Sequence, residues 1–302
     1  MSNLKTKRVQ IGDHSTATNN FVMHQSDTPD GKVHISNGTL DSHTSKVTLA
    51  HDGKLGIGTT SPGALLSIPA GGSSTPRFAI ESATDNNDFT ITQYEDGNGT
   101  YTMLGQNVKL NSGGNNTVSD AAHKTAGIQF DARNHGALTF VTGAANTATE
   151  NMQISSAGHV TTPNQPYFMV YRNGGNYNVG AGQTVSIIYD TARYNTGGHF
   201  NNSNYRFTAP IDGLYNFSGS VNHYNLPAGT RLRIQLHLNG QLTLMGGYIR
   251  TYDAGDHNVV FNSSLKLSAN DYVEMKRYSD GASAAGTSSG QLWNWFSGYL
   301  IG

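Results

Sequence analysis

The sequence predicts an all-β fold made of short strands and tight turns. Only 13% of its 302 residues are charged and 36% are hydrophobic, while 36 glycines accompany many Asn, Ser and Thr residues. This composition favours strands and turns over long helices. Short runs alternate apolar with polar residues, as half-buried strands do, and turn signals such as "PIDG", "LNGQ" and "SAND" separate them.

Net charge and cysteine content exclude several classes of function. The formal net charge of −1 predicts no affinity for nucleic acid or for an anionic membrane surface. The absence of cysteine excludes disulfides, thiolate zinc sites and cysteine nucleophiles. The first residues, "MSNLKTKRVQIGDHS", lack the apolar run of a secretory signal, and no membrane-spanning stretch follows. We therefore expect a soluble product of a cytoplasm.

Aromatic residues divide the chain into two predicted parts, with a boundary near "TTPNQPYF". Seven aromatic residues fall in 1–165 and 21 fall in 166–302. A part with so few large side chains cannot bury enough apolar surface to offset its conformational entropy alone. It needs partners, and identical copies of itself are the nearest ones. The predicted domains are 1–20, 21–165 and 166–302.

The first part contains many short β-like runs. They are "RVQIG", "KVHIS", "KVTLAHDGKLGIG", "FAIES", "FTITQYEDGNG", "YTMLG", "NVKLNSGG", "GIQFDARNHG", "ALTFVTG" and "NMQISSAGHV". The segments "HDGKLGIG" and "SSAGHVTT" share a pattern of two polar or small residues, glycine, one polar residue and a strand. This pattern predicts a degenerate repeat without a strict period.

The glycine-rich stretch "KLGIGTTSPGAL" (54–65) has the composition of a phosphate loop, a linker or a shaft repeat. A phosphate loop needs Lys and Ser or Thr after its last glycine, and a dinucleotide loop needs a glycine that opens a helix. Neither pattern is present. The longer segment "DGKLGIGTTSPGALLSI", and more weakly "ENMQISSAGHVTT", resembles a segment of bacteriophage tail-fibre proteins. That resemblance implies an intertwined trimeric shaft or shoulder, in which glycines let three chains approach closely. The second copy lacks the Gly-Ile-Gly core, so the junction near Val160 is expected to differ.

The second part resembles the globular head of complement component 1, subcomponent q, a ten-stranded jelly roll of the tumour-necrosis-factor type. The resemblance rests on "NTGGHFNNSNYRFTAPIDGLYNFSGSV", "RLRIQLHLNGQ", "LSANDYVEMK" and "WFSGYLIG", in this order. Asn270 stands where the family usually has glycine. Such a head implies a trimerising unit. Four aromatic residues are expected to help fill an axis shared by three copies: Trp293, Trp295, Tyr248 and Tyr272.

Strand alternation supports a sandwich independently of the resemblance. "RLRIQLHLN" places one set of side chains on the core face: Leu232, Ile234, Leu236 and Leu238. The other face carries Arg231, Arg233, Gln235 and His237. Strands of this length with tight turns favour an antiparallel sandwich.

No motif of catalysis or metal binding survives inspection, so no enzyme activity, cofactor or metal is predicted. "GTSSG" fits G-x-S-x-G around Ser288, but "SDGASAAG" precedes it and no helix pattern follows, as a nucleophile elbow requires. We expect His223, His237 and His257 on a surface or an interface. Asp253 and Asp256 lie close enough in sequence to bind calcium, as in some heads of this family, but they are also ordinary turn formers.

Strand direction predicts a recognition surface. In an antiparallel meander the connections alternate between two ends, and the C-terminus marks the base together with "SAND", "NGQ" and "PIDG". The longer connections 223–229, 251–257 and 279–290 then lie at the opposite end, the tip. Polar loops on a rigid scaffold often carry recognition, and Tyr and Asn suit sugars. The predicted receptor-binding residues are Tyr224, Asn225, Tyr252, Asp253, Asp256, His257, Ser279 and Asp280.

Together the resemblances imply a homotrimeric bacteriophage tail or side fibre with an elongated shaft or shoulder and a jelly-roll head. The head would bind a host cell-surface polysaccharide or an outer-membrane receptor. Residues 1–20 would attach the fibre to other phage tail or adaptor proteins, and the virion protein would assemble in the host cytoplasm. An alternative is a structural fibre or decoration protein whose head is mainly a trimerisation clamp. A glycan-cleaving tailspike would need paired carboxylates and a long β-helix, for which 21–165 is too short.

Overall fold

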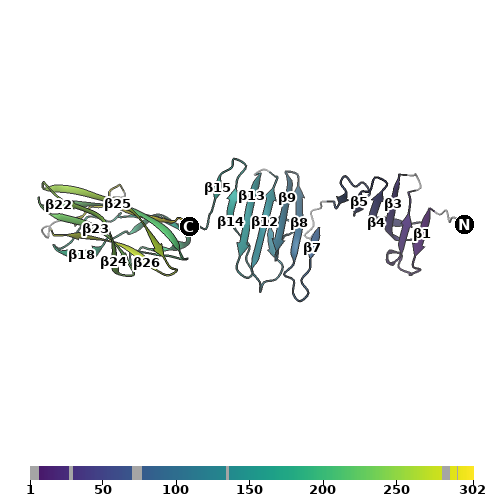
Figure 1. Ribbon diagram of the computed structural model, residues 1–302, viewed down its shortest axis with the longest axis horizontal. Coiled ribbons are helices and arrows are strands. Elements are labelled where there is room, and N and C mark those ends of the chain that lie inside the picture. The colour runs from purple at the N-terminus through teal and green to yellow at the C-terminus, as the bar shows by residue number, and fades with distance from the viewer. Residues whose placement is uncertain (1–6, 27–29, 70–76, 134–135, 281–285, 291) are drawn as a thin grey trace. The chain divides into compact units, whose positions relative to one another are not determined.

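The computed structural model describes residues 7–26, 30–69, 77–133, 136–280, 286–290 and 292–302. The chain forms two compact units, Met1–Thr162 and Pro163–Gly302 (Figure 1). In the described part, the regular structure is β-strand apart from two short 3-10 helices, η1 (Ala17–Asn19) and η2 (Thr196–Gly198). The predicted all-β class is confirmed. The domain limits 1–20, 21–165 and 166–302 stay predictions.

The first sheet contains six strands in chain order. They are β1 (Arg8–Ile11), β2 (Phe21–His24), β3 (Lys32–Gly38), β4 (His43–Ala50), β5 (Leu55–Ile57) and β6 (Leu66–Ser67). All pair antiparallel except β5 and β6, which are parallel. The sequence prediction missed β2 and β6, and it found the other strands through their alternation.

The glycine-rich stretch forms β5 and the loop that returns the chain to β6. The N–H of Gly58 donates to the carbonyl of Lys46 (2.8 Å), and the N–H of Leu55 donates to that of Leu65 (2.8 Å). A Cβ on Gly56 would lie 2.6 Å from the carbonyl oxygen of Thr59, so only glycine fits there. No helix begins at this loop, which agrees with the rejection of a nucleotide site.

The two segments of the predicted repeat, "HDGKLGIG" and "SSAGHVTT", form turns with the same backbone hydrogen bonds. After β4, the N–H of Ala50 donates to the carbonyl of Lys54 (2.9 Å) and the N–H of Gly53 donates back to Ala50 (3.0 Å). The same pair of bonds joins Ser155 to His159 (2.9 Å) and Gly158 to Ser155 (2.9 Å). Gly53 and Gly158 have φ of 83° and 81°, a conformation that glycine adopts without strain.

The second sheet contains seven strands in the order β15-β14-β13-β12-β9-β8-β7, drawn side by side in Figure 1. They are β7 (Phe78–Ile80), β8 (Phe89–Asp96), β9 (Gly99–Gln106), β12 (Thr125–Asp131), β13 (Ala137–Gly143), β14 (Thr149–Ile154) and β15 (Val160–Thr161). A hairpin of β10 (Val108–Leu110) and β11 (Asn116–Val118) accompanies it. Val108 and Leu110 of this hairpin form a small core with Met103 and Val141.

Each of these two sheets carries an apolar row that crosses its strands in register. In the first sheet, the paired residues are Val9, Met23, Ile35, Val47 and Ile57. In the second sheet, they are Phe78, Ile91, Leu104, Ile128, Phe140 and Met152. The described part of the single chain buries none of these side chains completely. Met23 is 47% exposed and Phe78 is 49% exposed.

Histidines lie on the opposite face of the first sheet. His24 and His34 are buried, and their rings stack with centroids 5.1 Å apart. The centroid of His43 lies 4.0 Å from that of His24. Burial lowers the pKa of His24, and the neighbouring charge of His43 lowers it further.

The second unit is a sandwich of two sheets. One sheet has the order β17-β27-β22-β28-β16-β19, with β25 paired to β22. The other has the order β20-β21-β26-β23-β24, with β18 paired to β26. The strands are β16 (Tyr167–Tyr171), β17 (Tyr177–Asn178), β18 (Gln183–Ser186), β19 (Thr191–Asn195), β20 (Phe200–Asn201), β21 (Arg206–Thr208), β22 (Gly213–Leu226), β23 (Arg231–Leu238), β24 (Gln241–Arg250), β25 (Gly255–Leu267), β26 (Tyr272–Ser279), β27 (Gly286–Thr287) and β28 (Trp295–Leu300).

Aromatic rings fill the space between these two sheets. The motif residues that carried the head resemblance are buried in this core: Phe200, Phe207, Tyr215 and Phe217. Phe207 stacks on Phe168, with centroids 5.0 Å apart. Leu232, Ile234 and Leu236 of β23 are also buried, as their alternation predicted. The opposite face of β23 is less exposed than predicted, because Gln235 and His237 are buried too.

Candidate functional site

Three connections of the second unit meet at the end of the sandwich opposite the C-terminus (Figure 1). They follow β22, β24 and β26. Pairing of His223 with His257 and of Arg231 with Arg250 brings the first two connections together. Pairing of Ser279 with Leu232 brings the third to the same end. We call this end the tip. We call the opposite end, near the C-terminus, the base. It carries the turns 210–213, 239–241 and 268–271. The first of these turns lies beside the end of the last strand, because Tyr215 pairs with Leu300.

Thr251 holds two tip connections together. Its Oγ1 donates to the carbonyl of Pro227 (2.7 Å) and accepts from the N–H of Thr230 (2.9 Å). Its backbone N–H also donates to the carbonyl of Thr230 (2.9 Å), and its carbonyl accepts from the N–H of Gly229 (2.7 Å). Thr251 is buried. The sequence prediction missed this residue, since a lone threonine beside a loop carries no distinguishing pattern.

The third connection begins with Asp280, which forms an ion pair with Arg231, and residues 281–285 of the predicted recognition loop lie outside the described residues. Asp280 accepts from the N–H of Arg231 (2.6 Å) and from its Nε (2.5 Å). Hydrogen bonding to Arg231 lowers the pKa of the Asp280 carboxyl. Ser279 precedes it inside the protein and is 2% exposed, so its side chain offers no surface in this chain. Of these two predicted receptor-binding residues, one is engaged internally and the other is covered.

The predicted residues of the second connection form the exposed part of the tip. Tyr252 is 89% exposed, and its ring lies edge-on to that of His257 with centroids 6.5 Å apart. His257 Nε2 lies 3.4 Å from Asp253 Oδ1. Tyr252 and Asp253 therefore present an aromatic face and a carboxylate together, while the imidazole of His257 beside them is only 14% exposed.

The predicted residues on β22 shape the backbone more than the surface. The strand register shifts between His223 and Leu226, and Asn225 there has φ of 53°. Asp256 Oδ1 accepts from the N–H of Asn225 (3.1 Å) and closes this bulge. The hydroxyl of half-buried Tyr224 donates to Asn178, which holds the ring in place. Asp256 and Asp253 thus serve separate contacts.

An open depression of about 450 Å³ lies beside this bulge. Its lining residues are Asn225, Leu226, Pro227, Ala254 and Gly255. Its volume lies in the range of small-ligand sites, roughly 300–1,000 Å³.

Two basic side chains lie buried beneath the tip, which corrects the expected surface position of His223. His223 and Arg277 are both 0% exposed. Arg277 Nη1 donates to Thr287 Oγ1 (2.8 Å), while its Nε and Nη2 and both ring nitrogens of His223 have no hydrogen-bond partner in the described part. Burial, and then the charge of Arg277, lowers the pKa of His223 well below its ordinary value. His223 follows Val221 on the inward face of β22, so alternation places it inside.

The other histidine and serine candidates also have structural contacts. His237 was expected at a surface or interface, but it is buried, where its ring contacts Gln235 Oε1 (3.1 Å) and the carbonyl of Gly240 (3.2 Å). Ser288 Oγ donates to Asn222 Oδ1 (2.6 Å) and follows the two-residue strand β27. No described helix follows it, so the requirements of a nucleophile elbow are not met.

One group of possible metal ligands lies in the first unit. Asp85, Asp120 and His123 place one donor atom each within 4.8 Å of one another. Among the residues that the structure describes, no other group of three or more His, Asp or Glu side chains meets this criterion.

Comparison with protein families identifies the class of the second unit. Residues 167–301 match the family model described as C1q domain. The C-terminal region is therefore a jelly-roll domain of the C1q and tumour-necrosis-factor type, as the sequence resemblance predicted. Domains of this type are typically binding or structural domains without enzymatic activity, and they often form homotrimers.

Several solved structures are similar to part of this chain. The globular domain of zebrafish complement 1qA protein is 18% identical, with 46% of this chain and 98% of that chain covered and a TM-score of 0.35. Murine APRIL at pH 8.5 is 10% identical, with 45% and 99% covered and a TM-score of 0.35. Eiger TNF from S. frugiperda is 11% identical, with 46% and 94% covered and a TM-score of 0.35. Among curated proteins, none matches the chain.

In the described ranges, no helix has the length and apolar character needed to cross a membrane.

Proposed function

We propose that the protein is a homotrimeric bacteriophage tail or side fibre whose head binds a host cell-surface receptor, a glycan, through the tip. In this proposal it is a structural protein of the virion, assembled in the host cytoplasm. Residues 1–20 attach it to other phage tail or adaptor proteins. It binds its receptor without cleaving it.

The observation that carries the trimeric fibre is the pair of apolar rows across the sheets of the first unit. A monomer rarely leaves such contiguous apolar surface in water. Full burial of one large apolar side chain contributes about 1.5–3 kcal/mol, so covering a half-exposed one contributes about 1 kcal/mol. Six strands of the second sheet each supply one residue to its row, and identical copies supply matching rows. The frequent trimerisation of C1q-type heads supports a stoichiometry of three.

The tip geometry supports glycan recognition. The exposed ring of Tyr252 offers an apolar face on which a pyranose stacks. Asp253 and His257 supply polar groups beside it, and the depression next to Asn225 lies on the same end. The hydrogen bonds of Thr251 to Pro227 and Thr230 fix the start of the segment that carries Tyr252 and Asp253.

The phage assignment rests on the sequence segment "DGKLGIGTTSPGALLSI". Within this segment, Gly56 allows a tight turn of the chain itself, because a Cβ there would meet the backbone of Thr59. Leu65 and Leu66 beside it are largely exposed and are available to neighbouring chains.

A second candidate is a structural fibre or decoration protein whose head is mainly a trimerisation clamp. The observation that favours it is that several tip side chains already bind other residues of the same chain. Asp280 is bound by Arg231, Asp256 by the backbone of Asn225, and Tyr224 by Asn178. These side chains stabilise the fold and leave fewer groups for a receptor.

Binding of labelled full-length protein to a panel of bacterial strains, and to their purified lipopolysaccharides and capsular polysaccharides, tests the proposal. We expect saturable binding to at least one polysaccharide without new reducing ends. Tyr252→Ala should weaken it roughly 2–13-fold, since a stacking contact on one aromatic ring contributes about 0.5–1.5 kcal/mol. Light scattering should give the mass of three chains.

Tyr299→Ala is the matched control, because Tyr299 is a half-exposed tyrosine near the base. It should leave binding unchanged. A trimer that binds no strain and no polysaccharide would favour the clamp. A monomer would remove the fibre altogether, and release of oligosaccharides would favour a tailspike enzyme.

A further inference from the structure

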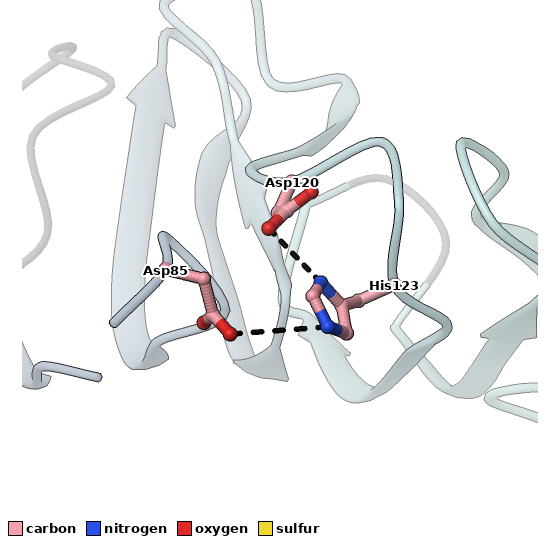
Figure 2. Close-up of side chains that lie close together, drawn as sticks. All are labelled: Asp85, Asp120 and His123. Carbon is pink, nitrogen blue, oxygen red and sulfur yellow. Dashed lines mark hydrogen bonds and ion pairs between the residues drawn. The ribbon is translucent and has the colours of Figure 1, made fainter. Parts of the chain in front are cut away.

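Two loops bring Asp85, Asp120 and His123 together (Figure 2). One loop precedes β8 and the other precedes β12, at one end of the strands of the second sheet. The ring of His123 lies between the two carboxylates. Its Nδ1 is 2.9 Å from Asp120 Oδ2, a hydrogen bond, and its Nε2 is 3.8 Å from Asp85 Oδ2. The second separation is too long for a hydrogen bond.

Each carboxylate has one oxygen fixed by its own loop and one oxygen facing the ring. Asp85 Oδ1 accepts from the N–H of Asn87 (2.9 Å), and Asp120 Oδ1 accepts from the N–H of Ala122 (2.8 Å). In the described ranges, neither carboxylate pairs with a lysine or an arginine.

Asn107 holds both loops in position from inside the protein. Its Nδ2 donates to the carbonyls of Asp120 (2.9 Å) and His123 (3.0 Å). Its Oδ1 accepts from the N–H of Asp120 (2.7 Å), and its own N–H donates to the carbonyl of Asp88 (2.9 Å) in the other loop. Asn107 is fully buried. A single buried residue thus sets the distance between the two halves of the group, which makes the arrangement preorganised.

We propose that this group binds one divalent transition-metal ion of the zinc class, with His123 Nε2 and Asp85 Oδ2 as direct ligands. Asp120 acts through His123, because it accepts the Nδ1–H and presents Nε2 to the ion. Imidazole and carboxylate are donors that zinc prefers, and a carboxylate on the second ring nitrogen raises ligand basicity. Two ligands of a tetrahedral zinc ion lie roughly 3.3 Å apart, so the 3.8 Å separation closes with a small side-chain rotation.

The donor set distinguishes this ion from calcium. Calcium takes 6–8 oxygen ligands and makes little use of imidazole. Here an imidazole is central, and the remaining positions on the ion are left to water or to another oxygen donor. The proposal is independent of the function of the tip, which lies in the other unit.

Isothermal titration of the full-length protein with zinc chloride tests the proposal. We expect saturable binding of one ion per chain at this group. Asp85→Asn and Asp120→Asn keep the Oδ1 acceptor that fixes each loop, so both variants should fold. His123→Gln and Asp85→Asn should each remove the site. Asp120→Asn should weaken it about 10–100-fold, as loss of an outer carboxylate does.

The matched control is His159→Gln, which removes an exposed histidine elsewhere in the first unit. It should titrate like the wild type. Cobalt supplies a second readout, because its visible spectrum should change on binding to the wild type and stay unchanged with His123→Gln. Far-UV circular dichroism checks that every variant is folded.

Three results would overturn the proposal: no saturable binding by the wild type, binding that His123→Gln leaves intact, or equal loss with His159→Gln. Full retention of affinity by Asp120→Asn would remove the orienting role of this residue.

Discussion

Replacing Asn107 with alanine should destabilise the first unit by about 4 kcal/mol. The Nδ2 group shares its two protons among the carbonyls of Asp120, His123 and Lys124, and Oδ1 accepts from the N–H of Asp120. Two donated bonds and one accepted bond at about 1 kcal/mol each give about 3 kcal/mol. Asn107 also has φ of 58°, and alanine in this left-handed region costs roughly 1 kcal/mol more.

Two further variants separate these contributions. Asn107→Gly loses the same hydrogen bonds but adopts the positive φ freely, so it should cost about 3 kcal/mol. Asn107→Asp keeps the acceptor for the N–H of Asp120 and loses the two donated bonds. Asn107→Ala should therefore lower the free energy of unfolding more than Asn107→Gly does.

Urea unfolding at one fixed protein concentration measures these differences. Both tryptophans, Trp293 and Trp295, lie in the second unit, so their fluorescence reports on the head and serves as the internal control. Far-UV circular dichroism reports on both units. An alanine variant within 1 kcal/mol of wild type, or a parallel loss in the tryptophan signal, would refute the assigned role of Asn107.

Two other predictions concern the first unit. Because the folded-state pKa of His24 lies below its ordinary 6.5, the unfolded chain binds more protons as pH falls, so stability present above pH 6.5 should be lost below it. His24→Gln should flatten this dependence in thermal melts between about pH 7.5 and 5, and an unchanged slope would contradict it. Ile128→Glu, in the middle of the second apolar row, should weaken self-association of the full chain while the head keeps its melting temperature. Light scattering across a dilution series measures this, with Asn98→Glu in the exposed turn between β8 and β9 as control.

Strand positions and the head core were predictable because they depend on local pattern. Alternation marks which side chains of β23 face inward, and Leu232 and Ile234 do so. The aromatic spacing of the head motif likewise predicts the buried Phe207 and Phe217. Such features need no knowledge of which strands are neighbours.

Features that depend on pairing between distant segments were not predictable. Asp85 meets His123 only because β8 and β9 pair in one register and Asn107 joins the loops. His223 looked like a surface residue because histidine is polar, although its inward position on β22 follows from alternation with Val221. Ser279 was assigned to the tip from its place in sequence, while the pairing of β26 with β23 covers its side chain.

The residues that stabilise the tip differ from the residues that it exposes to solvent, and Thr251 marks the boundary between them. Both ends of the β22–β23 connection and the start of the next connection are held by this one buried side chain. The residues between Thr251 and Gly255 lie outside that frame, and the most exposed of them is Tyr252. We expect mutations in this short segment to accumulate at little cost in folding. If the tip binds the receptor as proposed, a few loop codons could change that specificity while the sandwich beneath stays constant.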